Sequence, residues 1–374
     1  MPSLAVDTGV LPYQEILHLI SDGSIRAETE IDQSQVQPAS LDLRLGPVAY
    51  RVRASFLPGA RRSVHAVLEQ LTMHEIDLSN GAVLEKGCVY IVPLQEELDL
   101  PNGISAIANP KSSTGRLDVF TRLIADGSAS FDTIESGFSG PLFAEVAPCT
   151  FSVLARTGDR LSQLRLCRGR KVYNDAELRA LHDDTELVQS IAADPSFDRG
   201  IAFSVDLERA DGGVIGYRAR PHAPVIDLRK IAFYDPRDFW EPLLARPGAD
   251  IILNPGDFYI LASRESVIVP PDHAAEMVAY DTLVGEFRAH YAGFFDPGFG
   301  WAEAGGQGSK AVLEVRSHDV PFLLEHGQIV GRLVYEKVTE RPEKIYGSSI
   351  ASNYQKQQLK LGKQFKDWPK AIRN

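Results

Sequence analysis

Residues 109–119, NPKSSTGRLDV, gather side chains that suit an anionic ligand. Ser112 and Ser113 place two hydroxyls side by side, Gly115 frees backbone amides in a turn, and Arg116 follows at once. Such donors form a concave set that can hold phosphate oxygens. Lys111 adds a point charge, and an arginine can make a two-pronged contact with a phosphate or a carboxylate. The same string is also ordinary turn chemistry, so by itself it leaves both interpretations open.

The elements that must position this segment occur twice, because the sequence repeats itself at an offset of 169 residues. Residues 83–101 align without a gap on residues 252–270, and the identical pairs are Leu84/Leu253, Gly87/Gly256, Tyr90/Tyr259, Ile91/Ile260, Glu96/Glu265 and Pro101/Pro270. The same offset pairs Glu145 with Glu314, and Gly158 with Gly327. Upstream, ASLDLRL (39–45) resembles PVIDLRK (224–230) at a different offset. This internal similarity predicts two homologous units in tandem.

Each unit has the sequence pattern of a β protein. Short runs rich in β-branched and aromatic residues, such as VYIVPL and FYILAS, alternate with Gly, Pro, Asp and Asn turns. We expect a first unit at 1–170, a connector with a helix at 171–204, a second unit at 205–345 and a basic tail at 346–374. Helices are expected at 12–23 and at 174–193, where Asn174 and Glu177 form a capping-box pair.

The bulk composition argues against several classes of function. The chain has 374 residues, with 39 Lys and Arg against 50 Asp and Glu, which disfavours a general affinity for nucleic acid or anionic membranes. Cys88, Cys149 and Cys167 are widely spaced and odd in number, so we expect small buried residues without disulfides in a reducing compartment. The N-terminus lacks signal-peptide features, and no apolar run approaches the roughly 18 residues of a membrane span. These features predict a soluble cytoplasmic protein.

Five motifs, in order along the chain, resemble the dCTP deaminase family. They are QPASLDLRLG (37–46), KSSTGRL (111–117), AGFFDPGFG (292–300), AVLEV (311–315) and IYGSSIASNYQKQQ (345–358). That family belongs to the dUTPase superfamily of trimeric, jelly-roll-like β-barrel enzymes. The resemblance implies a mainly β chain built of two tandem dUTPase-like distorted β-barrel units with a few short helices. It also implies a homo-oligomer that converts dCTP to dUTP and ammonia, with feedback by dTTP as in some relatives.

The resemblance further implies roles for individual residues. Lys111, Ser112 and Ser113 would lie near the triphosphate, and Arg116 falls on the family's catalytic arginine. Asp296, Pro297 and Gly298 match the turn of the base-reading hairpin, Ala292 matches the position whose backbone contacts the pyrimidine, and Glu314 matches the general base. Tyr346 and Gln357 match phosphate contacts of the closing tail. A lysine usual in that tail falls on Asn353, so Lys356 is the candidate for its role.

Each copy has lost part of this set. In the second copy YDTLVGEF (280–287) replaces the serine segment, so that Asp281 and Gly285 stand for Ser112 and Arg116, and a carboxylate there would repel a triphosphate. The first copy keeps Glu145 but has a longer hairpin, 122–140, with IESG in place of Asp-Pro-Gly. We therefore predict one composite site, with Lys111 to Arg116 from the first copy and Glu314 from the second. Glu145 is the alternative base, and either glutamate could instead be an exposed strand residue.

The expected chemistry needs a water activated at C4 of cytosine and a proton delivered to the departing ammonia, which one carboxylate can do in turn. In this scheme Glu314 is the base, Ser112 orients the water and Arg116 completes the polar cluster, as in the family. Zinc deaminases need the motifs His-x-Glu and Pro-Cys-x-x-Cys. No histidine of the sequence begins a His-x-Glu motif, and after Pro148-Cys149 the position of the second cysteine is taken by Ser152. Magnesium is expected only as a bridge between triphosphate oxygens, without a dedicated set of protein ligands.

Other functions stay open from the sequence alone. A dUTPase, or a bifunctional deaminase that also cleaves dUTP, is the nearest enzyme alternative. A non-catalytic nucleotide sensor is possible because tandem copies with lost motifs can drift from catalysis. A carbohydrate-binding β-sandwich would need aromatic platforms, and Trp240, Trp301 and Trp368 are too scattered to form one.

Overall fold

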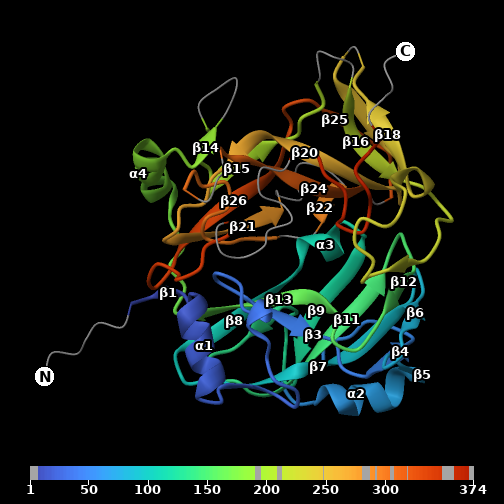
Figure 1. The fold of residues 1–374 in the computed structure, drawn as a ribbon, viewed down its shortest axis with the longest axis vertical. Coiled ribbons are helices and arrows are strands. Elements are labelled where there is room, and N and C mark those ends of the chain that lie inside the picture. Colours follow the sequence, from blue (N-terminus) through green and yellow to red (C-terminus); the bar gives the residue numbers. More distant parts are fainter. Residues whose placement is uncertain are drawn as a thin grey trace, which may run out of the picture.

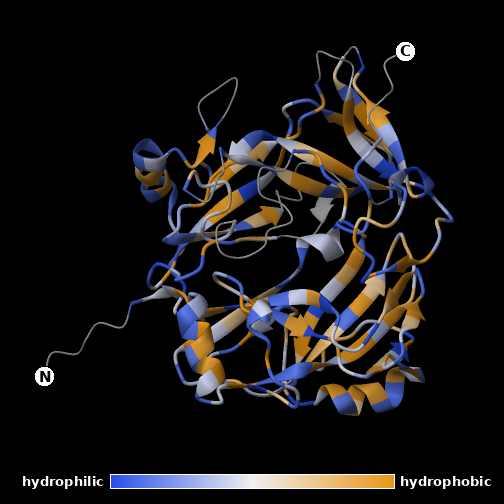
Figure 2. Cartoon of the chain, viewed as in Figure 1, coloured by the Kyte–Doolittle hydropathy of each residue, from blue (hydrophilic) through white to orange (hydrophobic). Residues whose placement is uncertain are grey.

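The computed structural model describes residues 7–189, 195–208, 213–246, 248–279, 287–290, 293–303, 307–317, 319–347 and 358–369. Over these residues the chain is mainly β, as predicted, and its two repeats form two units that meet at α3 (Ser112–Gly115) (Figure 1). Apolar residues recur along the strands of both units and on the helix α2 (Val64–Leu71) (Figure 2). Within the described residues, no helix combines the length and apolar character that a membrane crossing requires.

The first unit is built from three small sheets. One has the order β1 (Gly9–Val10), β13 (Arg160–Arg168), β8 (Ile104–Pro110) and β10 (Thr133–Ile134), with β3 (Leu41–Arg44) on β13. The second has the order β5 (Thr72–Asp77), β4 (Val48–Val52), β7 (Val89–Asp99), β11 (Ser139–Pro148) and β9 (Val119–Ala125), with β2 (Ile25–Ala27) on β7. The third joins β6 (Ala82–Leu84) to β12 (Val153–Ala155).

The second unit repeats these three sheets. One has the order β18 (Trp240–Leu244), β16 (Val214–Ala219), β20 (Phe258–Val267), β24 (Ser309–Ser317) and β22 (Phe287–His290), with β14 (Val188–Gln189) on β20. Another has the order β15 (Ile201–Ser204), β26 (Ile329–Lys337), β21 (His273–Ala279) and β23 (Phe294–Phe295). The last pairs β19 (Asp250–Leu253) with β25 (Phe322–Glu325). Strands β14 and β15, which fall inside the expected connector, thus pair with strands of the second unit.

The offset of 169 residues holds in three dimensions. Ile91 pairs with Glu145 across β7 and β11, and Ile260 pairs with Glu314 across β20 and β24. The same turn precedes each long strand. The hydroxyl of Tyr90 accepts from the Glu85 amide at 2.9 Å, and that of Tyr259 accepts from the Asn254 amide at 2.9 Å. Gly87 and Gly256 occupy these turns with φ of 76° and 75°, a left-handed conformation that favours glycine.

One alignment made from the sequence was wrong. The counterpart of Leu41–Arg44 is not residues 224–230 but β15, because equivalent glutamates bind the two strands. Glu96 accepts from the Arg44 amide at 2.8 Å, and Glu265 accepts from the Ser204 amide at 2.8 Å. Residues 224–230 instead contain β17 (Ile226–Asp227), which pairs in parallel with β12 of the first unit. The similarity of residues 224–230 to residues 39–45 therefore does not reflect equivalent positions, because β17 crosses from the second unit to the first.

The helices follow their capping signals. α1 (Tyr13–Ser21) ends with Asp22 as its C-cap, before Gly23, close to its predicted boundary. α4 (Asp175–Thr185) begins with the predicted capping box, in which the Asn174 side chain accepts from the Glu177 amide at 3.1 Å and Glu177 accepts from the Asn174 amide at 2.9 Å. It ends earlier than predicted because Glu186 is left-handed, with φ of 48°. α2 was not predicted; its Ser63 N-cap accepts from the Ala66 amide at 3.2 Å. Two 3-10 turns, η1 (Gln33–Gln35) and η2 (Pro236–Asp238), complete the described helical elements.

The hydrophobic core of the first unit continues into the second. Phe258 and Ile260 on β20, and Val312 on the same strand as Glu314, belong to the same cluster of buried residues as the first unit's core. Leu361 and Phe365 of the C-terminal tail join this cluster. A separate cluster fills the second unit. The two units are therefore held against each other by apolar packing as well as by the polar contacts described below.

Candidate functional site

Arg116 and Glu314 meet between the two units. Arg116 directly follows α3, which leads from β8 to β9, and Glu314 lies on β24. Both are buried, with 2% and 4% of their surfaces exposed, and Arg116 Nε lies 3.9 Å from Glu314 Oε1. The structure thus brings together one residue from each copy, the pairing that a composite site requires, within a single chain. It also shows that Glu314 is not an exposed strand residue.

Burial controls the acidity of Glu314. Loss of solvation raises the pKa of its carboxyl to about 8, although the Arg116 guanidinium acts in the opposite direction. Asp118, a further negative charge nearby, adds to the rise. A carboxyl with such a pKa exchanges protons near neutral pH, which a general base that later acts as an acid must do.

A second ion pair lies two residues further along both segments. Arg316 on β24 pairs with Asp118, and its Nη2 also donates to Thr150 Oγ1 at 2.9 Å. Its Nη1 donates to the Gly256 carbonyl at 2.7 Å. Because Arg116 and Asp118 face Glu314 and Arg316, the two ion pairs fix the segment after α3 against β24. The ion pair between Arg316 and Asp118 was not predicted from the sequence, because neither residue belongs to a repeated motif.

Glu145 has different surroundings, although it occupies the equivalent register position. It is buried, with 1% exposed, and Arg122 on the neighbouring strand β9 donates to its Oε1 from Nη2 at 2.5 Å and from Nε at 3.1 Å. The Arg122 guanidinium in turn lies 3.4 Å from the centre of the Phe131 ring. Glu145 is therefore neither an exposed strand residue nor joined to Arg116 by a described ion pair.

The Lys111–Thr114 segment forms one wall of a cavity of about 360 Å³. The cavity is lined by Asp42, Lys111, Ser113, Thr114, Gly158, Asp159, Arg160, Leu161, Leu228, Arg229, Ile231, Lys363 and Gln364. Lys111 pairs with Asp42, and Arg160 Nη1 lies 3.8 Å from the same Asp42 oxygen. Ser113 and Thr114 are buried while Ser112, at the start of α3, is exposed. Four cations and small hydroxyls around one cavity suit a phosphate chain.

The hairpin residue Asp296 is held from the first unit. It follows β23 and is contacted by Arg165 of β13, which is fully buried and lies 3.7 Å from Asp296 Oδ1. The same guanidinium lies 4.0 Å from the centre of the Phe294 ring. Burial raises the pKa of Asp296; Arg165 opposes this rise, Asp42 adds to it and Lys111 opposes it. The charges of Asp42 and Lys111, which line the cavity, therefore act on the hairpin residue Asp296.

The tail expected to close the site is partly described. Tyr346 donates from its amide to the Pro297 carbonyl at 2.8 Å, and its ring lies 5.7 Å from that of Phe299, so the start of the tail is fixed to the hairpin turn. Further on, the Lys360 carbonyl accepts from Arg116 Nη1 at 3.0 Å. Ala292, Asn353, Lys356 and Gln357 lie outside the described residues, as does the 280–286 segment.

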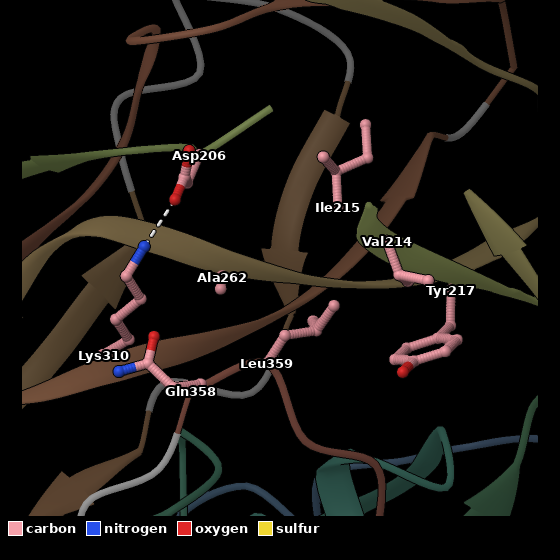
Figure 3. A pocket seen from close by; sticks show the side chains of 8 residues that line it. All are labelled: Asp206, Val214, Ile215, Tyr217, Ala262, Lys310, Gln358 and Leu359. Carbon is pink, nitrogen blue, oxygen red and sulfur yellow. Dashed lines mark hydrogen bonds and ion pairs between the residues drawn. The ribbon is translucent and has the colours of Figure 1, made fainter. Parts of the chain in front are cut away.

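A second cavity, of about 240 Å³, lies in the second unit and shares no lining residue with the first (Figure 3). Its polar wall carries an ion pair between Lys310 and Asp206, and Val214, Ile215 and Tyr217 form the opposite wall. Gln358 and Leu359 of the tail reach it as well. Among the described residues its lining holds one cation, Lys310, against four in the first cavity, so it suits a polyphosphate less well than the first.

Neither metal ligands nor disulfides organise the site in the part of the chain that the structure describes. No group of three or more His, Cys, Asp or Glu side chains there is arranged to hold a metal ion. Cys88, Cys149 and Cys167 are free thiols, and Cys167 is buried as predicted, whereas Cys88 and Cys149 are only partly buried. Burial raises the pKa of the Cys149 and Cys167 thiols to about 11 and about 12, so neither is poised as a nucleophile.

Family comparisons match both units. Residues 7–170 match the N-terminal domain of 2′-deoxycytidine 5′-triphosphate deaminase, and residues 174–365 match its C-terminal domain. A crystal structure of 2′-deoxycytidine 5′-triphosphate deaminase from Agrobacterium tumefaciens is 55% identical, with a TM-score of 0.85, and the match covers 90% of this chain and 100% of that one.

Curated relatives match over shorter stretches. A protein of Clavibacter michiganensis named "dCTP deaminase, dUMP-forming" is 32% identical over 142 residues, which cover 36% of this chain and 66% of the relative. A protein of the same name from Kocuria rhizophila is 29% identical over 190 residues, which cover 49% of this chain and 88% of the relative.

Proposed function

This chain belongs to the dCTP deaminase family, and we propose that it deaminates dCTP to dUTP and ammonia at a single composite site with Glu314 as the general base. It is thus a dCTP deaminase, a hydrolase of pyrimidine nucleotide metabolism. The observation that carries the proposed site is the buried approach of Arg116 and Glu314 across the two units. The equivalent sheet orders of the units support two tandem dUTPase-like barrels, and the pairing of β14 and β15 extends the second barrel into the expected connector.

In the proposed reaction, Glu314 accepts a proton from a water molecule while the water oxygen bonds to C4 of cytosine. The proton then passes to the exocyclic nitrogen, the C4–N bond breaks and ammonia leaves, which regenerates the carboxylate. The proton that remains on the added hydroxyl moves to N3, so that C4 becomes the carbonyl carbon of uracil. Arg116, 3.9 Å away, keeps the carboxyl oriented and limits the rise of its pKa. Ser112 would orient the water from the exposed start of α3, a role taken from the family.

The same geometry suggests how dCTP is oriented. The triphosphate would enter the cavity beside Lys111, Ser113 and Thr114, while the base lies between Glu314 and the Asp296 hairpin. Tyr346 fixes the start of the tail to that hairpin, and Gln357 and Lys356 would reach the phosphates from the following stretch. Homo-oligomer formation and inhibition by dTTP are further proposals that rest on the family resemblance.

Magnesium fits this arrangement as an ion carried by the substrate. Asp42 Oδ1 is a buried acceptor without a hydrogen-bond partner in the described structure, so it could accept from water in the shell of a triphosphate-bound Mg²⁺. When bound, the ion would neutralise part of the phosphate charge. No zinc is assigned a role, because the proposed chemistry uses the carboxylate alone to activate water.

The experiment that tests the proposal follows ammonia and pyrophosphate separately. The purified protein is incubated with magnesium and dCTP, dUTP or CTP, and ammonia release from dCTP with accumulation of dUTP is the expected result. Binding of dCTP without any ammonia would contradict catalysis and favour a nucleotide sensor.

A bifunctional enzyme is the second candidate. The curated relatives from Clavibacter michiganensis and Kocuria rhizophila are named as dUMP-forming, and this observation favours a second step in which dUTP is cleaved. Release of pyrophosphate together with ammonia from dCTP would establish that candidate, and dUMP would then replace dUTP as the product.

A further inference from the structure

A segment of the second half of the chain crosses onto the first unit and borders the phosphate cavity. This crossing segment, residues 226–234, begins with β17, which pairs in parallel with β12. Arg156 donates to both carboxylate oxygens of Asp227, at 2.7 and 3.0 Å. Arg229 donates to Asp159 at 2.6 Å and to the Thr157 carbonyl at 2.7 Å. These contacts fix the crossing segment to the turn that carries Asp159 and Arg160.

The crossing segment in turn holds the described part of the tail. The Ala232 amide donates to the Lys363 carbonyl at 2.9 Å, the Phe233 amide to the Gln364 carbonyl at 2.9 Å, and the Lys366 amide to the Tyr234 carbonyl at 2.9 Å. Phe365 packs against the rings of Phe239 and Trp240, 5.2 and 5.9 Å away between ring centres. The backbone at Lys363 is therefore held by hydrogen bonds and by a buried aromatic anchor.

This backbone places Lys363 in the wall of the 360 Å³ cavity, together with Lys111, Ser113 and Arg160. The other lysine and both arginines of the cavity already lie near carboxylates: Lys111 pairs with Asp42, Arg160 lies 3.8 Å from Asp42, and Arg229 pairs with Asp159. Lys363 is half-buried and has no ion-pair partner among the described residues. Burial and the neighbouring Lys111 lower the pKa of Lys363, and the carboxylates of Asp42 and Asp159 oppose this effect only in part.

We propose that Lys363 binds the triphosphate of the substrate, as a cation that the second half of the chain supplies to the phosphate cavity of the first unit. The inference rests on the proposed function, because it assigns the ligand of the same site. Asp42 and Asp159 line the same cavity but form no ion pair with Lys363 among the described residues, so a polyphosphate beside Lys111 and Ser113 would give Lys363 its direct anionic partner. The crossing segment would keep the ammonium in place before the substrate arrives. Such preorganisation lowers the entropic cost of binding.

The test compares Lys363→Met with Lys366→Met, a matched control on the same segment whose side chain is exposed. Dissociation constants of dCTP, dCMP and inorganic triphosphate are measured by calorimetry, and KM and kcat for dCTP are measured separately. We expect Lys363→Met to weaken dCTP and inorganic triphosphate about 10- to 100-fold, the usual effect of losing a charged hydrogen bond. KM for dCTP should rise while kcat changes little, because the contact is made equally in the ground state and the transition state.

Binding of dCMP should change much less, and Lys366→Met should resemble the wild type throughout. Equal affinities of Lys363→Met and wild type for dCTP and inorganic triphosphate would overturn the inference, as would an equal loss for dCMP. Lys363→Gln, which keeps a polar end group, provides a second variant if the first does not fold. If the wild type releases no ammonia but Lys363→Met still binds triphosphate weakly, the proposed function fails and the inference stands.

Discussion

Glu145 and Glu314 occupy the same register position in the two units, yet their neighbours give them different properties. Arg122 donates twice to Glu145, and this pair lies within the first unit. Glu314 faces Arg116 at 3.9 Å and lies in surroundings that raise its pKa to about 8. A carboxyl with a pKa near neutrality is well suited to proton exchange, and Glu314 also lies beside the arginine that the composite site requires. Single residues therefore explain why we assign the reaction to one copy.

The first prediction at this scale concerns pH. A general base must be ionised, so with a pKa of about 8 for Glu314 we expect kcat/KM for dCTP to rise with pH and to level off above 8. Below that value each pH unit should lower kcat/KM about tenfold. Steady-state kinetics between pH 6 and 9 check this, and a flat profile over the range would contradict Glu314 as the base.

The second prediction concerns stability. The pKa of Glu314 is higher in the folded protein than its ordinary value of 4.5, so the native state favours the protonated form. The contribution of the protonated Glu314 carboxyl to the free energy of unfolding is fully present below about pH 4.5. It is lost as pH rises towards 8. Glu314→Gln should therefore be more stable than the wild type at pH 8, by on the order of 3 kcal/mol, with the difference shrinking towards pH 5. Thermal melts at both pH values measure it; a pH-independent difference would argue against the shifted pKa.

At the scale of elements, α2 distinguishes the first unit from the second. Val64 and Leu68 on this helix belong to a buried cluster with Ile91, Ile124 and Phe143, which lie on the strand of Glu145 and on its two neighbours. In the second unit the equivalent strand positions Ile260 and Val312 belong to the core that joins the two units. The first unit thus covers this surface with its own helix α2, whereas the second unit uses the equivalent surface to pack against the first unit.

This role of α2 predicts the effect of shortening Leu68. Leu68→Ala should destabilise the protein by about 2 to 5 kcal/mol, because it leaves a cavity in a buried cluster, and kcat for dCTP should be unchanged. Glu69→Ala, an exposed change on the same helix, is the control. Chemical denaturation and steady-state kinetics of the folded variants separate the two effects. A loss of kcat in Leu68→Ala would place α2 in the active site instead.

The sequence could predict the elements whose signals are local. The capping box at Asn174 and Glu177, the glycine turns at Gly87 and Gly256 and the register of both glutamates follow from short patterns. The crossing segment could not be predicted, because β17 pairs with a strand of the other unit and its sequence resembles a different strand. The Arg316–Asp118 pair and the position of Lys363 likewise depend on how the units meet.

At the scale of the whole molecule, the proposed composite site takes both of its residues from one chain. Arg116 and Glu314 come from different copies, and both copies are joined by the connector. Two inactive variants, Arg116→Gln and Glu314→Gln, should therefore not restore activity when they are co-expressed, whatever the oligomeric state. If the residues instead met between chains, mixed assemblies would contain some intact sites. Ammonia release by the co-purified mixture measures this, and recovery to about a quarter of wild-type activity would contradict a site in one chain.

The most direct test of the account compares Glu314→Gln with Glu145→Gln in the release of ammonia from dCTP. Calorimetric binding of dCTP and thermal melts ensure that both variants are folded and bind substrate. We predict that Glu314→Gln lowers kcat by a factor of about 100 to 10,000 while still binding dCTP, as expected for loss of a general base. Glu145→Gln should keep most of its kcat. The opposite ranking, with Glu145→Gln inactive and Glu314→Gln active, would contradict the composite site.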